Sequence, residues 1–295
     1  MAGPHPPDVA VAAEDQAPGA MVQADRPLHR RRGTPSLSAA LAGTASVVVV
    51  VGLLVLLFTT APGASKVASS FFSVGKLGAS AGTVASGFLL NVELTVVSEA
   101  LVLVLALVIA VVRSLPGPAF LALRGLAVLY TDVMRGIPIV LVVFMVGFGL
   151  PGLQLGFISN QSLFSYGVVS LVLVYSAYVA ENYRAGIESV HPSQVSAARS
   201  LGLSRWQAMR HVVLPQAIRT VIPPLMNDLI GLEKDTALVG LIGLVEASRA
   251  AQDYASTTFN FAGYTMAAIL FIAITIPLAR FTDYVVARGR RRRGV

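Results

Sequence analysis

The chain has 295 residues, of which 55% are hydrophobic and only 13% are charged, and its mean hydropathy is +0.73. Soluble domains carry about a quarter charged residues, so one water-soluble core cannot hold this sequence and the lipid bilayer is its natural solvent. The absence of cysteine excludes disulfides, thiolate metal sites and a cysteine nucleophile. A net charge of +7 would suit a nucleic-acid-binding protein, but the arginines gather in the tails and in one loop between apolar segments. That distribution favours membrane orientation instead.

The first part of the chain changes character near residue 38. Residues 1–37 are rich in Pro, Ala and Asp and then turn basic, which predicts a disordered cytoplasmic N-terminal tail. Residues 38–62 are predicted to form an N-terminal transmembrane anchor helix, and 63–86 an external loop. A secretory signal is the alternative for the first apolar run, but the preceding tail is too long and too acidic for one.

A helix that spans the bilayer needs about 20 mainly apolar residues. Five stretches are candidates on this ground: 39–61, 88–112, 137–157, 165–180 and 259–278. A sixth, 217–245, is interrupted by Pro223 and Pro224, by Asn227 and Asp228, and by the charged run 233–235, so a broken helix is expected there. Six spans place both termini on one side, and most loop arginines then fall on that side. The pattern predicts an N-in, C-in topology, with residues 283–295 as a basic cytoplasmic tail.

The longest inner loop, residues 189–216, is predicted to form two short helices joined by a tight turn at the membrane surface. Ser193 is expected to cap the first helix, and Gly202 to end it in the left-handed conformation. Ser204 starts the second helix with a glutamine three residues later, the spacing of a capping box. Pro215 is expected to limit this second helix.

The same loop has features of a docking element. The small residues Ser196, Ala197 and Ala198 would let the backbone of a partner approach closely. Trp206 is the only tryptophan in the chain, and it is predicted to be a buried anchor in a partner's groove. The alternative is an amphipathic surface helix with an interfacial tryptophan. The pattern by itself leaves both interpretations open.

The run 196–202, Ser-Ala-Ala-Arg-Ser-Leu-Gly, is followed after nine residues by 212–215, Val-Val-Leu-Pro. It resembles the EAA loop of ABC-importer permeases, which reads Glu-Ala-Ala, three residues, Gly, nine residues, Ile, any residue, Leu-Pro. Other blocks resemble the polar amino acid permeases of the histidine, glutamine and arginine type: 130–138, 177–187, 224–227 and 234–238. The resemblance covers residues 87–280. Ser196 stands where the family has its loop glutamate, and Ser193 where it usually has a glycine.

The resemblance implies an all-α polytopic membrane protein with a five-helix importer-permease (MetI-like) core plus one N-terminal transmembrane helix. Residues 87–282 would be the permease transmembrane domain, and 189–216 its cytoplasmic coupling loop. The implied function is import of polar amino acids as the permease subunit of an ABC importer in the plasma membrane of a prokaryote. Coupling to the ATPase is assigned to Ser193, Ser196, Ala197, Ala198, Gly202, Trp206, Leu214 and Pro215.

The resemblance also implies partner proteins. The chain carries no Walker A sequence, so ATP and Mg²⁺ would be bound and used by a separate ABC ATPase, and the chain itself is expected to be neither an enzyme nor a cofactor-binding protein. An extracytoplasmic solute-binding protein would deliver the substrate. A second permease subunit, identical or homologous, would complete the translocation path within the membrane lipid.

Ionisable residues within the apolar segments are costly and often mark a transport path. Glu99 is a candidate partner for a substrate ammonium, or is simply protonated. Lys234 and Asp235 would line the path, or neutralise each other near the outer interface. The run 135–138, Arg-Gly-Ile-Pro, predicts a helix break at a boundary. Arg135 would meet a substrate carboxylate there, or snorkel to lipid headgroups. The candidates for the translocation path or its gate are therefore Glu99, Arg135, Asn227, Lys234, Asp235 and Thr236.

Two other classes of protein remain as alternatives. An ion-coupled secondary transporter of a small polar solute would explain Glu99 and the interrupted span, but it predicts inverted repeats, which the sequence does not show. An intramembrane enzyme would need a nucleophile–base pair or metal ligands within the spans, and the four histidines lie in the tail and the loop. Glu181 and Arg184, three residues apart near the inner boundary, are expected to form an ion pair.

Overall fold

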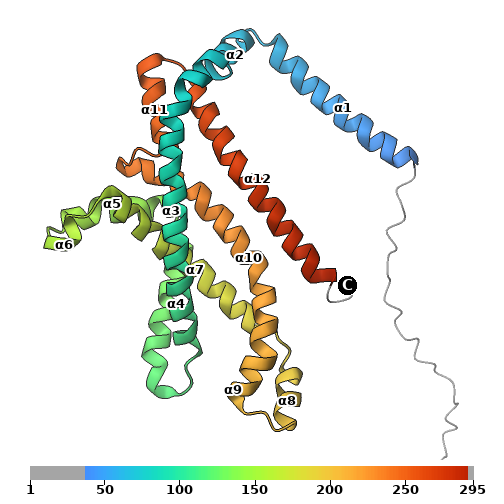
Figure 1. Cartoon of the computed structure of the whole chain (residues 1–295), viewed down its shortest axis with the longest axis vertical. Helices are drawn as coiled ribbons and strands as arrows, with labels where there is room; N and C mark the ends of the chain where they lie inside the picture. Colours follow the sequence, from blue (N-terminus) through green and yellow to red (C-terminus); the bar gives the residue numbers. More distant parts are fainter. Residues whose placement is uncertain (1–36, 292–295) are drawn as a thin grey trace, which may run out of the picture. The chain divides into compact units, whose positions relative to one another are not determined.

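The computed structural model describes residues 37–291, so the tail predicted over 1–37 lies outside the described residues except for Leu37. The chain divides into two units, one ending at Ala61 and one starting at Pro62. Helix α1 (Leu37–Thr60) is the described part of the first unit (Figure 1). Its apolar side chains are exposed, and it is long and apolar enough to cross a membrane. Exposed apolar residues along a whole helix suit a lipid environment.

The second unit begins with two helices in the segment predicted as an external loop, residues 63–86. Helix α2 (Ala64–Phe71) is followed by α3 (Val74–Ser114), which has 41 residues. The segment after Pro62 is rich in alanine and contains no further proline, so it is helical apart from the short break at Phe72 and Ser73. At 1.5 Å per residue α3 is about 60 Å long, roughly twice the thickness of the hydrocarbon core. It therefore extends well beyond a bilayer.

Helix α4 (Leu121–Gly136), which follows the short 3₁₀ turn η1 (Pro118–Phe120), and helix α5 (Ile139–Gly152) meet at an angle of 106°. Pro138 lacks the N–H that a continuing helix needs, and it holds Ile137 in an extended conformation. This confirms the helix break predicted at this boundary. The pair replaces the single straight span predicted over 137–157.

Helix α7 (Leu163–Glu188) lies at the centre of the second unit and packs on α3, α4, α5 and α10. Ser162 caps its first turn by accepting a hydrogen bond from Ser165 N. The helix is longer at both ends than the segment predicted, 165–180. Its core side chains, such as Leu171 and Val179, are fully buried.

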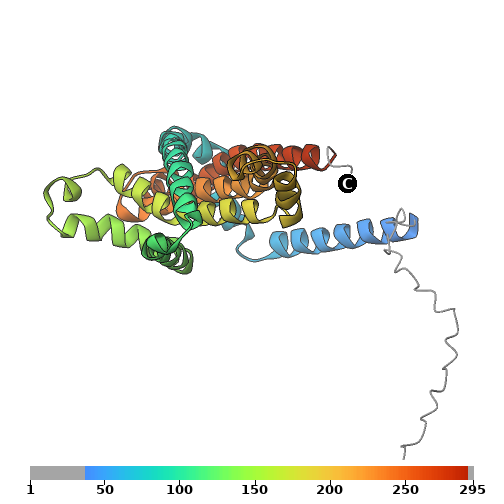
Figure 2. The same cartoon turned by 90° about the horizontal axis from the view of Figure 1, so that it is seen from below.

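The C-terminal half continues through the coupling loop into three long helices (Figures 1 and 2). The elements after α7 are α8 (Pro192–Ser200), α9 (Arg205–Ala208), a π-helical turn η2 (Met209–Val213), α10 (Leu214–Asp235), a 3₁₀ turn η3 (Thr236–Ile242), α11 (Ala247–Thr258) and α12 (Ala262–Arg291). A four-residue turn, α6 (Gly156–Ser159), joins α5 to α7. Because α12 runs to Arg291, most of the basic tail predicted over 283–295 is helical.

Helix α10 continues through Pro223 and Pro224, so the helix break expected at these prolines is wrong. The two prolines leave the carbonyls of Arg219 and Thr220 without helical donors. Both of those residues are exposed, so other donors can reach these carbonyls. The α-helix instead ends at Asp235, where η3 begins.

Within the described residues, four helices are long and apolar enough to cross a membrane, and the bent pair α4–α5 makes a fifth. The four are α1, the α2–α3 segment, α7 and α12. The sixth predicted span, 217–245, is not among them, and α10 carries four charged residues, Asp228, Glu233, Lys234 and Asp235, in its last eight positions. All regular elements in the described part are helical. The predicted all-α polytopic membrane fold is confirmed.

Candidate functional site

The N-cap of the first helix in the coupling loop lies two residues earlier than predicted. His191, not Ser193, is the N-cap of α8, and its Nδ1 accepts a hydrogen bond from Ser193 N at 3.2 Å. Pro192 occupies the first helical position, where its fixed φ and missing N–H cost nothing. The proline therefore moves the cap to the residue before it and leaves Ser193 inside the first turn.

Gly202 ends α8 as predicted. Its φ is +87°, and it donates a hydrogen bond to Arg199 O at 3.0 Å, while Leu203 N bonds to Ala198 O at 3.2 Å. These two bonds define a Schellman motif. No other atom comes within 4 Å of a Cβ built on Gly202, so conformation rather than space requires glycine here.

The second half of the loop contains one confirmed and one wrong prediction. The capping box is present: Gln207 N bonds to Ser204 Oγ at 3.2 Å, and Ser204 N bonds to Gln207 Oε1 at 2.8 Å. Pro215, however, does not end the helix, since the chain passes through the π turn into α10. In a regular α-helix the ring would collide with the carbonyl four residues earlier, and the wider π turn just before Pro215 relieves that collision.

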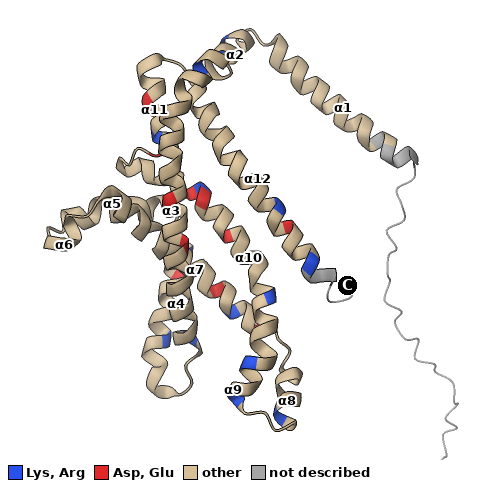
Figure 3. Cartoon of the chain, in the orientation of Figure 1, with Lys and Arg blue, Asp and Glu red and all other residues tan. Residues whose placement is uncertain are grey.

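The loop presents apolar side chains at its tip. Leu201 is 82% exposed and Trp206 is 70% exposed, on either side of the glycine turn. Ala198 is buried, whereas Ser196 and Ala197 are exposed on α8 and Leu214 is exposed at the start of α10. Figure 3 shows basic residues along the same end of the molecule, over α8, α9 and the start of α10. The tip can insert into an apolar groove with a surrounding acidic rim.

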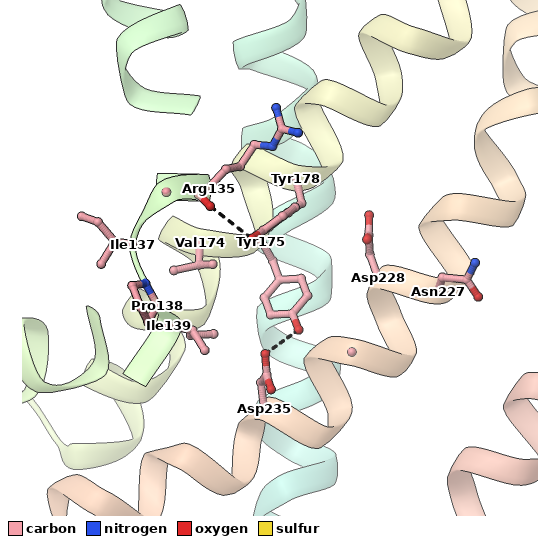
Figure 4. A pocket seen from close by; sticks show the side chains of 12 residues that line it. Arg135, Ile137, Pro138, Ile139, Val174, Tyr175, Tyr178, Asn227, Asp228 and Asp235 are labelled. Carbon is pink, nitrogen blue, oxygen red and sulfur yellow. Dashed lines mark hydrogen bonds between the residues drawn. The ribbon is translucent and has the colours of Figure 1, made fainter. Parts of the chain in front are cut away.

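A cavity of about 450 Å³ lies between the α4–α5 bend, α7 and α10 (Figure 4). Three of the predicted path residues line it: Arg135, Asn227 and Asp235. Three other polar residues in its wall, Tyr175, Tyr178 and Asp228, were not among the predicted path residues. The structure therefore brings together residues from distant parts of the sequence in one polar pocket within the transmembrane unit.

The carboxylates in this cavity lie on one wall. Asp228 and Asp235 are seven residues apart, two turns on one face of α10. Tyr175 Oη donates a hydrogen bond to Asp235 Oδ2 at 2.7 Å, and Asn182 Nδ2 donates to Asp228 Oδ2 at 2.6 Å. Each carboxylate keeps acceptor capacity for a cationic group.

The cationic residue of the cavity comes from the other side. The guanidinium of Arg135 lies 5.9 Å from the ring centroid of Tyr178, and Figure 4 shows it pointing away from the two aspartates. Tyr178 Oη also donates a hydrogen bond to Arg135 O at 3.5 Å. A cation–π contact of this kind keeps the charge near the rim. Acidic and basic groups on separate walls suit a small ligand that carries both charges.

The other predicted path residues lie outside the cavity lining. Glu99 on α3 is half-buried, and its Oε2 is one of few buried side-chain oxygens without a hydrogen bond in the described part of the chain. Lys234 is exposed. Asp235 accepts its hydrogen bond from Tyr175 and not from Lys234. Thr236 is fully buried in a polar network beside the cavity.

This network was not predicted. Asn91 Nδ2 donates to Thr236 Oγ1 at 3.0 Å and to Glu246 Oε2 at 3.1 Å, while Ala247 N donates to Asn91 Oδ1 at 3.0 Å. Glu246 also caps α11 by accepting hydrogen bonds from Ser248 N and Arg249 N, both at 2.8 Å. Asn91, Thr236 and Glu246 are fully buried. The network fixes the segment after α10 against α3.

A charged cluster joins three helices at the C-terminal end of α3. Arg113 Nη1 contacts Glu181 Oε2 at 2.9 Å and Thr131 Oγ1 at 3.3 Å, linking α3 to α7 and α4. Arg184 pairs with Glu181 and with Glu188. The predicted pair between Glu181 and Arg184 is confirmed. The described residues contain no cluster of histidines and carboxylates that could hold a metal ion.

Comparison with known proteins relates this chain to one family of transport proteins. The family described as "Binding-protein-dependent transport system inner membrane component" matches residues 119–291. The chain is 37% identical over 203 residues to the probable glutamine ABC transporter permease protein GlnM of Bacillus subtilis, covering 68% of this chain and 91% of that protein. It is 35% identical over 202 residues to the arginine transport system permease protein ArtQ of the same organism, covering 68% and 90%.

Solved structures agree with these sequence matches. A crystal structure of an amino acid ABC transporter with histidines matches with a TM-score of 0.64 and 32% identity, covering 70% of this chain and 94% of that chain. An inward-facing structure of the MetNI methionine ABC transporter matches with a TM-score of 0.58 and 19% identity, covering 70% and 95%. The second likeness concerns the fold alone.

Proposed function

The chain belongs to the binding-protein-dependent transport system inner membrane component family, and we propose that it is the permease subunit of an ATP-driven ABC importer for polar amino acids. The relatives named for glutamine and arginine transport support amino acids as the cargo. The observation that carries the proposal is the exposed pair Leu201 and Trp206 on a loop fixed by the Gly202 turn. Exposed apolar side chains surrounded by polar and basic residues, as on this loop, are typical of a protein-interaction site.

The partner for this tip is a separate ABC ATPase, which binds ATP and Mg²⁺. The α8–α9 unit is short and is fixed at its turn and its caps, so it moves as one body with whatever holds it. Helix α10 continues directly from the loop through η2. A displacement of the ATPase would therefore reach the cavity along α10, by rigid-body motion. Ser196 and Ala197 face the same partner from α8, and Ser193, Leu214 and Pro215 shape the ends of the loop.

This assignment orients the chain in the membrane of a prokaryote. The coupling loop lies in the cytosol, and the basic end of the molecule in Figure 3 lies on the same side, as expected for inner loops. With α10 crossing the bilayer as a sixth span in spite of its charged residues, both termini are cytoplasmic. The opposite side receives the solute-binding protein that delivers the substrate.

The cavity beside the α4–α5 bend is the part of this chain that contacts the substrate. The ammonium group of an amino acid would bind Asp228 and Asp235, and its carboxylate would bind Arg135 after that side chain turns inward from Tyr178. Lys234 and Thr236 act on the gate beside the cavity and not on the ligand. A second permease subunit closes the path on the open side, and the membrane lipid encloses the pair.

The proposal is tested with the double variant Leu201→Ala, Trp206→Ala in the full transporter. Loss of ATPase co-purification and of ATP-dependent uptake is expected, because truncation of a buried aromatic anchor typically costs about 2 kcal/mol or more in binding. The matched control is Phe157→Ala on α6, an aromatic side chain that is 84% exposed and far from the loop in sequence. Unchanged ATPase binding by the double variant, or uptake driven by an ion gradient without any ATPase, would contradict the proposal.

A further inference from the structure

Two adjoining cavities lie where α3 and α7 end. One, of about 340 Å³, is bounded by α3, α7 and α10 and lined almost wholly by apolar side chains. The other, of about 640 Å³, is bounded by α3, α4 and α7. Ala110, Ser114 and Ile187 line both cavities. The two spaces are therefore neighbours, and one of them is apolar.

The larger cavity carries an excess of positive charge. Arg113, Arg124 and Arg184 line it together with Glu188, and Glu181 neutralises part of the cluster from α7. Three guanidinium groups against two carboxylates leave one positive charge. Neither Arg113 nor Arg124 uses all its donors: Arg124 Nη1 bonds to Leu115 O at 2.8 Å, and Arg113 bonds through Nη1. An arginine has five N–H donors, so both retain donors for an anion.

The two cavities lie in the fold where the boundary of a bilayer is expected. Ser114 is the last residue of α3 and Glu188 the last of α7, and both helices qualify as membrane spans. On α3 the apolar cavity begins at Leu107, six residues before Arg113. Leu107 therefore lies about 9 Å farther than Arg113 from the end of the helix. The basic groups thus lie at the helix ends and the apolar space extends inward from them.

We propose that the two cavities together bind one anionic phospholipid, with its phosphate on Arg113 and Arg124 and an acyl chain in the apolar cavity. A basic pocket between transmembrane helices, at the level of the headgroups, is a known type of site for anionic lipid headgroups. A free phosphate would satisfy the arginines but would leave the adjoining apolar space without an occupant. The lipid would join α3, α4, α7 and the start of α10, which is the helix that continues the coupling loop.

The proposal is tested on the full-length permease purified with its ATPase in detergent, by native mass spectrometry with added dioleoylphosphatidylglycerol or dioleoylphosphatidylcholine. The anionic lipid should bind more tightly. Arg124→Gln should weaken its binding about fivefold, the effect of one basic residue near a charged headgroup, and should leave the neutral lipid unaffected. Arg280→Gln is the matched control, since that side chain on α12 is 81% exposed and lies outside both cavities.

Three results would overturn the proposal. One is equal affinity for the two lipids in the wild-type protein, which requires no variant. Another is equal binding of the anionic lipid by Arg124→Gln and the control. The third is displacement of the lipid by inorganic phosphate at matched concentration, which would indicate a simple anion site. These readouts do not depend on transport, so they stand apart from the cargo and coupling proposed above.

Discussion

Gly202→Val is the substitution whose effect follows most directly from the structure. The φ of Gly202 is +87°, a region that costs an L-amino acid about 1–2 kcal/mol, and a β-branched side chain fits it least well. No atom lies within 4 Å of an added Cβ, so no collision adds to this cost. The predicted penalty is therefore conformational and amounts to about 1–2 kcal/mol.

This penalty acts on the turn that separates Leu201 from Trp206 and fixes the positions of both in the coupling loop. A cost of about 1–2 kcal/mol lowers the population of the native turn relative to alternatives by roughly 5- to 30-fold. If the ATPase binds only the native arrangement, its apparent affinity falls by up to the same factor. The fold of the transmembrane helices should be unaffected, because the turn lies outside them.

The assay is the affinity of the purified permease for its ATPase, with ATP-dependent uptake in proteoliposomes as a second readout. Gly78→Val on α3 is the matched control: it too has no atom within 4 Å of an added Cβ, but its backbone is helical. The control should bind the ATPase like the wild type. Wild-type affinity and coupling in Gly202→Val would refute the reasoning that the left-handed turn positions the docking surface.

Three other experiments test the remaining parts of the site. Asn91→Leu leaves the buried N–H of Ala247 without its acceptor, so the free energy of unfolding should fall by about 1–3 kcal/mol, measured by thermal unfolding in detergent. A double-mutant cycle of Arg113→Ala with Glu181→Gln should give a coupling energy of about 1 kcal/mol; additive effects would show no direct interaction. Asp235→Asn should raise the KM for uptake about tenfold with ATPase binding unchanged, and an unaltered KM would exclude substrate contact.

The features that the sequence predicted well are those set by neighbouring residues. Gly202 and the Ser204–Gln207 capping box depend on a few consecutive residues, and both are present as expected. The bend before Pro138 is equally local, because proline restricts the residue before it. Apolar length alone was enough to indicate four of the spans, those formed by α1, α3, α7 and α12.

The wrong predictions concern prolines whose effect depends on the wider helix. Pro215, Pro223 and Pro224 each predict a helix end, yet the chain passes them through a π turn and a continuous α10. A π turn arises from the geometry that tertiary packing demands, and residue propensities do not encode it. The cap at His191 was missed for a simpler reason, since histidine is not among the usual capping residues.

The site itself was predicted in part. Arg135, Asn227 and Asp235 were identified because charged or amide groups in apolar segments stand out, but nothing in the sequence indicated that they share one cavity. Glu246 was missed because its partner Asn91 lies 155 residues away, and it reads as an ordinary acidic residue at the start of a helix. An acidic residue followed by Ala-Ser-Arg was the one local signal for its capping role.

The most direct test is uptake of a labelled polar amino acid into proteoliposomes that contain the permease, its solute-binding protein and either the ATPase or none. The account predicts accumulation only when both the ATPase and ATP are present on the side of the coupling loop. Equal accumulation without the ATPase, driven by a proton or sodium gradient, would contradict it.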